Sequence, residues 1–514
     1  MENNWEELDA LMENDPAARA LSMGMTVEEM CGAARLREMN PFSSPRYTQG
    51  DQGNGFLFAD FYHHCLRYVK GRGCWFLYRD GAWEEDAGGL GAMEKAMELA
   101  RLMNLLADEM IEPNARTAAQ KRALRLFGVR VRENMLHDAR SLCAIPMEAF
   151  DADPLLFNCL NGTLDLRDFS FYEHRASDLI THKAGVWYDP SAACARWDRF
   201  IAEIMARPEE TQLRMQDQPD PAREKARYLQ KVLGYALTGS TREECFFILY
   251  GKTTRNGKGT LVETMLRMLG TYGRTALPET IADRSASASA PNEDIARLRG
   301  SRFVSMSEPP RSMRFAEATI KRMTGSDTQT ARFLHQNSFE FLPQFKIFIN
   351  ANYLPTIADA TLFHSGRVRV IPFERHFALH EQDKGLKAYL TRPECLSGIL
   401  NWCLEGLRLY RAEGLGEPED VAQAIARYQA DSDVLGRFME ECLMEDENAK
   451  TRLMVVYQRY RTWCAENGLT SESSIMFRRM LEGRVTIVKA RPSKNEGATK
   501  LVMGYRCLSK DSCV

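Results

Sequence analysis

One stretch, residues 245–269, constrains the fold of this chain more than any other, and it reads CFFILYGKTTRNGKGTLVETMLRML. It opens on an apolar run that is too short for a helix and predicts a buried strand. A loop rich in Gly, Thr and Asn follows, then Lys258 and a helical pattern with apolar residues on one face. Because the amides of such a loop and of a helix N-terminus face phosphates, the stretch predicts a nucleotide-triphosphate site.

The bulk composition is that of an ordinary globular protein. The chain has 514 residues, a net charge of −3, 44% hydrophobic and 27% charged residues, which is enough length for about three domains. No apolar run is long enough to span a membrane, so we expect no membrane partner. The 13 cysteines include no C-x-x-C pair, which argues against a zinc ribbon and for a reducing, cytoplasmic setting.

Basic charge gathers in two parts of the chain. Residues 297–346 hold nine Lys and Arg against four Asp and Glu, and residues 450–500 hold eleven against four. Two basic regions on a slightly acidic chain are expected where a protein meets phosphates. Charge alone leaves open the alternative of two solvated faces.

The order of predicted elements indicates an α/β protein with three regions. Residues 1–190 combine aromatic strand–turn–strand patterns, a helical stretch and two strands around the Asn161–Gly162 turn, and so predict a mixed α/β region. Residues 191–445 predict an ATPase motor with leading and trailing helices, because two short apolar strands follow the phosphate-loop strand, as in a parallel sheet. In residues 446–514, short helices precede a basic hairpin, a pattern that predicts a winged helix.

Within the loop, Lys258 is predicted to contact the β- and γ-phosphates of ATP. The loop departs twice from the general pattern G-x-x-x-x-G-K-[ST]. Its first glycine lies one residue farther from the second, and Gly259 takes the position whose hydroxyl normally binds Mg²⁺. Either the Thr260 hydroxyl, one residue later, or water would replace that ligand. The predicted nucleotide-binding residues are Gly251, Asn256, Gly257, Lys258, Gly259 and Thr260.

Two later strands end in polar residues that suit ATP hydrolysis. Glu308 ends an apolar strand where a motor needs a carboxylate that orients or deprotonates the attacking water, and it is also a candidate Mg²⁺ ligand. Asn352 ends the next apolar strand, where its amide would hydrogen-bond the γ-phosphate or the water, and Asn350 is its rival. The alternatives are a surface glutamate and an ordinary turn asparagine.

Arg367 and Arg369 lie on one face of a last predicted strand, residues 367–373. Either guanidinium could reach the γ-phosphate that is bound to a neighbouring subunit. For each of them, the alternative is an ordinary salt bridge.

A polar tip between two alternating segments predicts a hairpin at residues 328–341, inserted into the motor. The hairpin carries Arg332 and His335, and Lys321 and Arg322 precede it. Such a basic hairpin suits gripping the phosphate backbone of single-stranded DNA. An ordinary surface hairpin is the alternative.

Nine segments follow one another in a recognisable order: NGFLFADFY, FNCLNGTLDL, ARWDRF, YLQKVLGYALTG, GKTTRNGKGTL, DIARLRGSRFVSMSEP, IKRMTGSD, TARFLHQNSFEFLPQFKIFINANYLP and RVRVIPFERHF. Their order resembles the phage/plasmid primase-helicase family, which also includes the poxvirus uncoating-type NTPases. The motor of that family is a superfamily 3 helicase. The resemblance covers most of the chain, from about residue 50 to about residue 510.

The resemblance implies an AAA+ type motor in a homo-oligomeric ring, a hexamer, with ATP between subunits and single-stranded DNA in the pore, moved 3′ to 5′. By this likeness Gly257 and Lys258 form the phosphate loop, Glu308 is the Walker B acid, Asn352 is the sensor and Arg367 is the favoured arginine finger. The implied setting is replication of a phage or other mobile element in the cytoplasm of a bacterial host, with a separate primase or initiator as a candidate partner.

Two positions depart from the family pattern. Family members often carry Ser at the position of Gly259, and Lys near the hairpin tip at the position of Gln336. Many members have an N-terminal primase domain, but here the helicase-associated pattern begins near Asn54, so we expect no primase domain in this chain. Two other functions stay open, namely a DNA-binding initiator whose ATP site only switches assembly, and an ATPase that translocates duplex DNA.

Overall fold

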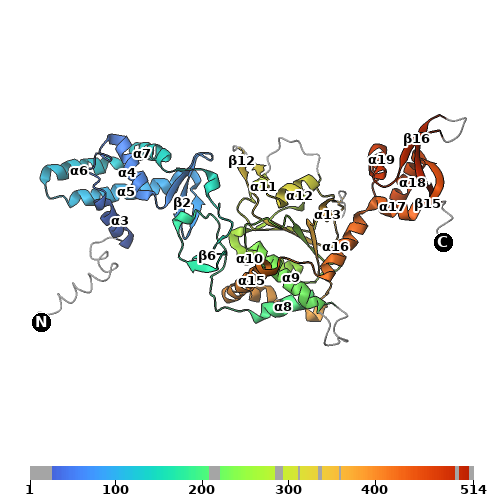
Figure 1. Cartoon of the computed structure of the whole chain (residues 1–514). Coiled ribbons are helices and arrows are strands. Elements are labelled where there is room, and N and C mark those ends of the chain that lie inside the picture. The colour runs from blue at the N-terminus through green and yellow to red at the C-terminus, as the bar shows by residue number, and fades with distance from the viewer. Residues whose placement is uncertain are drawn as a thin grey trace.

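The computed structural model describes residues 26–207, 220–283, 293–310, 313–333, 338–357, 361–491 and 497–508. It is a mixed α/β structure around a central parallel sheet, as the sequence predicts. Figure 1 shows the N-terminal elements on one side of this sheet and the C-terminal elements on the other, beyond helix α16. Among the described residues, no helix is both long and apolar enough to cross a membrane.

The N-terminal elements pack helices against a small sheet with strand order β3-β2-β1-β4. Aromatic side chains fill this core, as the dense run of Phe, Tyr and Trp predicts, and the Phe58 ring lies 5.0 Å from the Tyr62 ring. The elements are α3 (Val27–Glu38), α4 (Gly50–Tyr62), β1 (Leu66–Val69), β2 (Cys74–Arg79), β3 (Ala82–Glu85), α5 (Leu90–Asp108), α6 (Pro113–Leu126), α7 (Val129–Leu142) and β4 (Ala144–Ile145).

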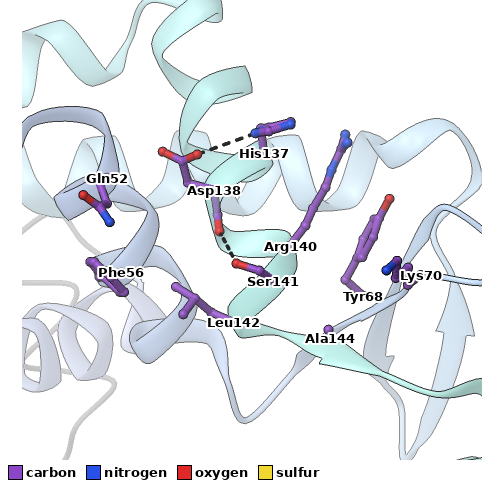
Figure 2. Close-up of a pocket in the computed structure, with 10 residues that line it drawn as sticks. All are labelled: Gln52, Phe56, Tyr68, Lys70, His137, Asp138, Arg140, Ser141, Leu142 and Ala144. Atoms are coloured by element: carbon purple, nitrogen blue, oxygen red, sulfur yellow. Dashed lines mark hydrogen bonds and ion pairs between the residues drawn. The ribbon is translucent and has the colours of Figure 1, made fainter.

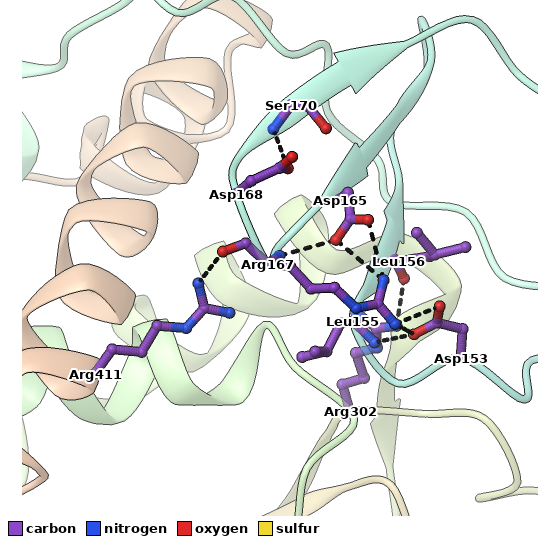
Figure 3. A network of polar contacts seen from close by, with 9 residues as sticks. All are labelled: Asp153, Leu155, Leu156, Asp165, Arg167, Asp168, Ser170, Arg302 and Arg411. Carbon is purple, nitrogen blue, oxygen red and sulfur yellow. Dashed lines mark hydrogen bonds and ion pairs between the residues drawn. The ribbon is translucent and has the colours of Figure 1, made fainter.

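A second small sheet belongs to the core of the central region, residues 191–445, and not to that of the N-terminal helices. It contains three strands, where the sequence predicts two: β5 (Leu156–Asn158), β6 (Thr163–Asp165) and β7 (Ser170–Tyr172). The buried Arg302 guanidinium holds it to the central region by donating to the carbonyls of Leu237 and Leu156, each at 2.5 Å. Figure 3 shows the contact of Arg302 with Leu156, and it also shows Arg411, which donates to the Arg167 carbonyl at 3.0 Å.

The central region is built on five parallel strands in the order β14-β8-β13-β10-β9. The strands β8, β10 and β13 are largely apolar and are buried on both faces, as expected of a parallel sheet. Phe246 and Ile248 of β8 face one core, and Phe247 and Leu249 face the other. The strands are β8 (Phe246–Tyr250), β9 (Gly273–Thr275), β10 (Phe303–Ser307), β13 (Lys346–Ala351) and β14 (Val368–Pro372).

Helices cover both faces of this sheet, with α9, α10 and α15 on one side and α12 and α13 on the other (Figure 1). The hairpin β11 (Gln329–Ala331) and β12 (Phe339–Phe341) is antiparallel, which confirms the predicted hairpin. The helices are α8 (Ala195–Met205), α9 (Pro221–Ala236), α10 (Lys258–Leu269), α11 (Glu293–Ala296), α12 (Glu317–Thr324), α13 (Thr361–His364), α14 (Leu386–Leu390), α15 (Pro393–Glu413) and α16 (Glu419–Ser432).

The C-terminal elements have a separate core under a sheet of order β15-β17-β16. The trailing helices, predicted to reach about residue 445, end at Cys442, and strand β15 begins at Leu443. Helix α17 packs into this C-terminal core. The elements are α17 (Val434–Cys442), β15 (Leu443–Arg452), α18 (Leu453–Glu466), α19 (Ser474–Glu482), β16 (Ile487–Ala490) and β17 (Thr499–Cys507).

Helices α9 and α15 approach each other through two glycines. A Cβ atom added at Gly234 would lie 2.2 Å from the Leu407 backbone nitrogen, and one added at Gly406 would lie 2.1 Å from the Gln230 carbonyl oxygen. Both neighbours are backbone atoms that cannot move aside as a side-chain end can. The close packing of these two helices therefore requires glycine at both positions.

We expect Gly234→Ala to lower the free energy of unfolding by about 1–3 kcal/mol, because the added methyl group overpacks the helix contact. Gly259→Ala is the matched control, since a Cβ there meets no atom within 4 Å and alanine favours a helix. Calorimetric melting of both variants checks this. Equal melting temperatures would contradict the close contact.

Candidate functional site

The parallel register brings three predicted functional segments to one edge of the sheet. Ser307, the last residue of β10, pairs with Asn350 of β13, and Ala351 of β13 pairs with Tyr250, the last residue of β8. The segments that follow these strands are Glu308, Asn352 and the loop from residue 251. Because ligands of open α/β sheets bind at the carboxyl ends of the strands, this edge is the candidate site.

The loop turns into helix α10 at Gly257, which adopts the left-handed backbone with φ 86°. A Cβ at this position would lie 2.3 Å from Cγ2 of Ile204 in α8, so glycine is required by both conformation and space. Lys258 is the first residue of α10. The first amides of a helix have no partner within it, so those of Lys258, Gly259 and Thr260 are available to an anion.

Gly251 and Asn256 close the loop from the inside. The buried Asn256 amide donates to the Thr253 carbonyl at 2.7 Å. A Cβ at Gly251 would lie 2.1 Å from Nδ2 of Asn256 and 2.9 Å from Nζ of Lys258. Gly251 therefore leaves the space in which the lysine and the asparagine side chains fit.

Lys258 and Asn352 are in direct contact. The Lys258 ammonium donates to Oδ1 of Asn352 at 2.8 Å and to the Gly251 carbonyl at 3.3 Å. Burial lowers the pKa of Lys258 from 10.5 to about 8. No carboxylate pairs with this ammonium among the described residues. A buried cation held only by neutral oxygens is poised for an anionic ligand, and the triphosphate of a nucleotide fits this need.

The geometry favours Asn352 over Asn350, which the sequence leaves as a rival. Asn352 contacts Lys258 by its side chain, whereas the Asn350 carbonyl accepts a hydrogen bond from the Glu308 amide at 2.9 Å. Glu308 is exposed and has φ 55°, a left-handed conformation that is uncommon for a glutamate. Such strain is found at functional sites where surrounding structure enforces it.

Gly259 and Thr260 lie in the first turn of α10. Gly259 is exposed and has open space where a side chain would be, while Thr260 is half-buried. The described residues contain no group of three or more His, Cys, Asp or Glu that could hold a metal ion by themselves. A divalent ion at this site would therefore rely on phosphate oxygens and water in addition to Thr260 and Glu308.

The segment after β14 borders the loop. None of its residues is among the predicted site residues. Its Phe377 amide donates to the Arg255 carbonyl at 2.9 Å, and His376 Nδ1 lies 2.8 Å from the Thr254 carbonyl. Glu374 pairs with the buried Lys225 of α9 at 2.9 Å. These positions lie in RVRVIPFERHF, one of the nine segments that carry the family resemblance. The sequence alone predicts no role for them.

Arg367 lies at the opposite edge of the sheet from Lys258. It directly precedes β14, which runs parallel to β8, so it is near the amino ends of the strands. Its guanidinium donates to the Thr324 hydroxyl at 2.8 Å and to the Glu244 carboxylate at 2.5 Å. Arg369 pairs with Glu417. Neither arginine is directed to the phosphate loop of its own chain.

The candidate DNA-binding residues surround the inserted hairpin. Lys321 and Arg322 form the last turn of α12, where the Lys321 ammonium donates to the Thr361 hydroxyl at 2.7 Å. Arg322 and Arg332 are exposed. His335 lies outside the described residues, as does the position of Gln336.

Family comparisons find D5-type matches toward both ends of the chain. Residues 56–206 match the model described as "D5 N terminal like", and residues 430–511 match the model described as "Poxvirus D5 protein-like". These matches support a likeness to the D5-like primase-helicase family. The first model covers the N-terminal elements up to α8, and the second covers the C-terminal sheet.

Three viral proteins are similar to this chain. "Putative helicase L207/L206" of Acanthamoeba polyphaga mimivirus is 30% identical over 49% of the chain and 28% of its own length. "Putative helicase 022R" of Frog virus 3 is 25% identical over 72% of the chain and 44% of its own length. "Putative helicase 121R" of Invertebrate iridescent virus 3 is 25% identical over 62% of the chain and 35% of its own length. The chain thus spans less than half the length of each of these relatives.

Among solved structures, the apo structure of the NrS-1 C-terminal region aligns with 85% of this chain and 95% of that region. The TM-score is 0.46 and the sequence identity is 10%.

The pKa of Lys258 predicts how nucleotide affinity depends on pH. A triphosphate binds the protonated amine, and in the free protein this amine loses its proton near pH 8, so we expect affinity to fall as the pH rises from about 7 to about 9. Binding of a fluorescent nucleotide at several pH values measures this. Lys258→Arg is the control, because arginine stays charged and removes the pH dependence.

Protein stability has the opposite pH dependence at this residue. The folded pKa of about 8 lies below the ordinary 10.5, so the unfolded chain binds more protons between these values, and this residue adds stability as the pH rises.

Nucleotide affinity that stayed constant from pH 7 to pH 9 would contradict the role given to the Lys258 ammonium.

Proposed function

We propose that this chain is an ATP-driven motor, a superfamily 3 helicase with an AAA+ type core, that translocates on single-stranded DNA during replication. The single observation that carries the proposal is the buried Lys258 ammonium, held against Asn352 without a carboxylate partner among the described residues, at the sheet edge where Glu308 also lies. The names of the viral relatives support a helicase, and the strand order supports the AAA+ type, since the Asn352 strand lies between the loop strand and the Glu308 strand.

The residues at the edge fit ATP and Mg²⁺. Lys258 and the amides from Asn256 to Thr260 would hold the phosphates, and Glu308 and Thr260 would hold the metal ion, directly or through water. Bound Mg²⁺ neutralises charge on the phosphates. Glu308 orients and accepts a proton from the attacking water, and Asn352, in contact with Lys258, responds to the loss of the γ-phosphate.

Arg367 supports a site shared between subunits. It lies at the amino edge of the sheet, across from the loop of its own chain, so the phosphates it can reach belong to a neighbouring copy. A ring of identical subunits, a hexamer by family resemblance, gives each loop one such neighbour. In the single chain the guanidinium is held by Glu244 and Thr324 until a neighbour's phosphates attract it.

The same contact links the proposed finger to the proposed DNA grip. Thr324 is the last residue of α12, and the Gln329 amide at the start of the hairpin donates to the Arg322 carbonyl of that helix at 3.0 Å. A shift of Arg367 toward a neighbour's phosphates would release Thr324 and move the helix that leads into the hairpin. Lys321, Arg322 and the hairpin would transmit this movement to the strand.

The C-terminal elements support a winged helix. Three helices and three strands follow the order α17-β15-α18-α19-β16-β17, and β17 lies between β15 and β16. Because α17 packs into this unit, we propose that the motor ends near Ser432 and not at residue 445. The N-terminal boundary near residue 190 stays a proposal, with β5, β6 and β7 packed on the motor.

ATP hydrolysis with and without single-stranded DNA tests the function. A motor is stimulated by the strand, whereas an initiator that uses ATP only to switch assembly is not. Unwinding of forked DNA with a 3′ or a 5′ tail then tests strand separation and the 3′ to 5′ polarity. Stimulation by duplex DNA without strand separation would support a duplex-translocating ATPase instead.

We expect Arg367→Ala to lower the rate of ATP hydrolysis by about 10³-fold or more, while nucleotide affinity changes little, because an arginine finger stabilises charge in the transition state. Arg369→Ala is the matched control, since it removes a neighbouring guanidinium that pairs with Glu417. Steady-state hydrolysis and nucleotide binding are measured on both variants. A larger loss in Arg369→Ala would move the role to that residue, and full activity of Arg367→Ala would contradict it.

A further inference from the structure

Three clefts adjoin one another where the N-terminal sheet faces the inserted hairpin. The first lies between α4, α7 and β1 and is drawn in Figure 2, with Tyr68, Lys70 and Arg140 among its lining residues. The second cleft shares Lys70 with the first and includes the hairpin residue Phe339. The third shares Phe339 with the second and reaches Arg274 of β9. Shared lining residues make the three clefts one continuous groove.

Basic side chains without a carboxylate partner mark both ends of the groove. Lys70, Arg140 and Arg274 are exposed, and within the described part of the chain none of them forms an ion pair. Most other surface arginines near them are paired, as Arg72 is with Glu85 at 2.8 Å. Unpaired cations along a groove attract a polyanion, because their charge is not neutralised within the chain.

Aromatic rings lie beside two of the guanidinium groups. The Arg140 guanidinium lies 5.3 Å from the Tyr68 ring centre, and that of Arg72 lies 5.2 Å from the Phe333 ring centre. Phe333 in turn stacks on Phe339 across the hairpin, with ring centres 5.7 Å apart. Rings hold the guanidinium planes in place, and both rings and planes offer flat faces to unstacked bases.

Carboxylates in the groove restrict where phosphates can run. Asp138 in the first cleft lies 3.5 Å from His137. Glu148 and Glu340 line the second cleft and would repel a phosphate backbone. A strand must therefore place its phosphates on the side of Lys70 and Arg140 and turn its bases toward the acids.

We propose that this groove binds single-stranded nucleic acid and extends the path of the strand from the inserted hairpin over the N-terminal sheet to α7. Lys70 and Arg140 contact phosphates, and the pairs Arg140–Tyr68 and Arg72–Phe333 contact bases. The proposal rests on the proposed function at its hairpin end, because the hairpin supplies Phe333 and Phe339. The cations can bind phosphates, and the flat faces of the rings and guanidinium groups can stack on exposed bases, so the groove fits a single strand. It does not fit a duplex, whose bases are stacked inside.

The test is binding of fluorescent oligo-dT to the full chain without nucleotide, measured by anisotropy over a range of salt concentrations. For a strand of about 20 nucleotides, we expect the double variant Lys70→Ala/Arg140→Ala to bind at least tenfold more weakly. The slope of log K against log salt should fall by about 1.4, since each lost contact to a single strand contributes about 0.7. A strand of about 6 nucleotides, enough for the hairpin end alone, should bind both proteins more equally.

Lys121→Ala/Arg125→Ala is the matched control, because it removes the same charge from α6, outside the groove. It should bind the long strand as the unchanged protein does. If the two double variants bound the long strand with equal affinity and equal salt slope, the proposal that this groove binds the strand would be overturned. Failure of DNA to stimulate ATP hydrolysis, with the groove variant still impaired in binding, would count against the motor and leave the groove in place.

Discussion

The parallel pairing of β8, β13 and β10 is the constraint on which the rest of the structure depends. Its register places the ends of three strands side by side, so that Lys258, Asn352 and Glu308 meet at one edge although long stretches of chain separate them. The same strand direction puts Arg367 at the opposite edge. Under the proposed function, one sheet carries two halves of a site that a single chain does not bring together, and this separation is the physical reason for proposing a ring.

Buried cations in this chain differ in the groups that accept their hydrogen bonds or balance their charge. This difference marks Lys258 as the candidate site for a phosphate. Arg302 and Lys346 are buried at the amino ends of β10 and β13, where main-chain carbonyls accept the hydrogen bonds of their side chains. Lys225 is buried between the carboxylates of Glu374 and Asp420. Lys258 has neither a ring of carbonyls nor a carboxylate among the described residues, and burial lowers its pKa to about 8. A phosphate would supply the charge partner that this buried ammonium lacks.

Local patterns predict the loop and the strands around it, because an apolar run, a glycine loop and a helical period are properties of neighbouring residues. The choice of Asn352 over Asn350 needs the register, which is a long-range property. Strand β15 could not be predicted, since its polar sequence becomes a strand only by pairing with β17. The contact of Glu374 with Lys225, and a groove that joins Tyr68 to Arg274, likewise arise from residues that are distant in sequence.

The most direct measurement of the shared site mixes two inactive variants. Lys258→Ala lacks the phosphate-binding ammonium and Arg367→Ala lacks the finger, so each alone should hydrolyse almost no ATP. In mixed rings, an intact loop from one subunit meets an intact Arg367 from its neighbour, and hydrolysis should return to a measurable fraction of that of the unchanged protein. A mixture as inactive as its two parents, with mixed assemblies present by mass, would contradict a site shared between subunits.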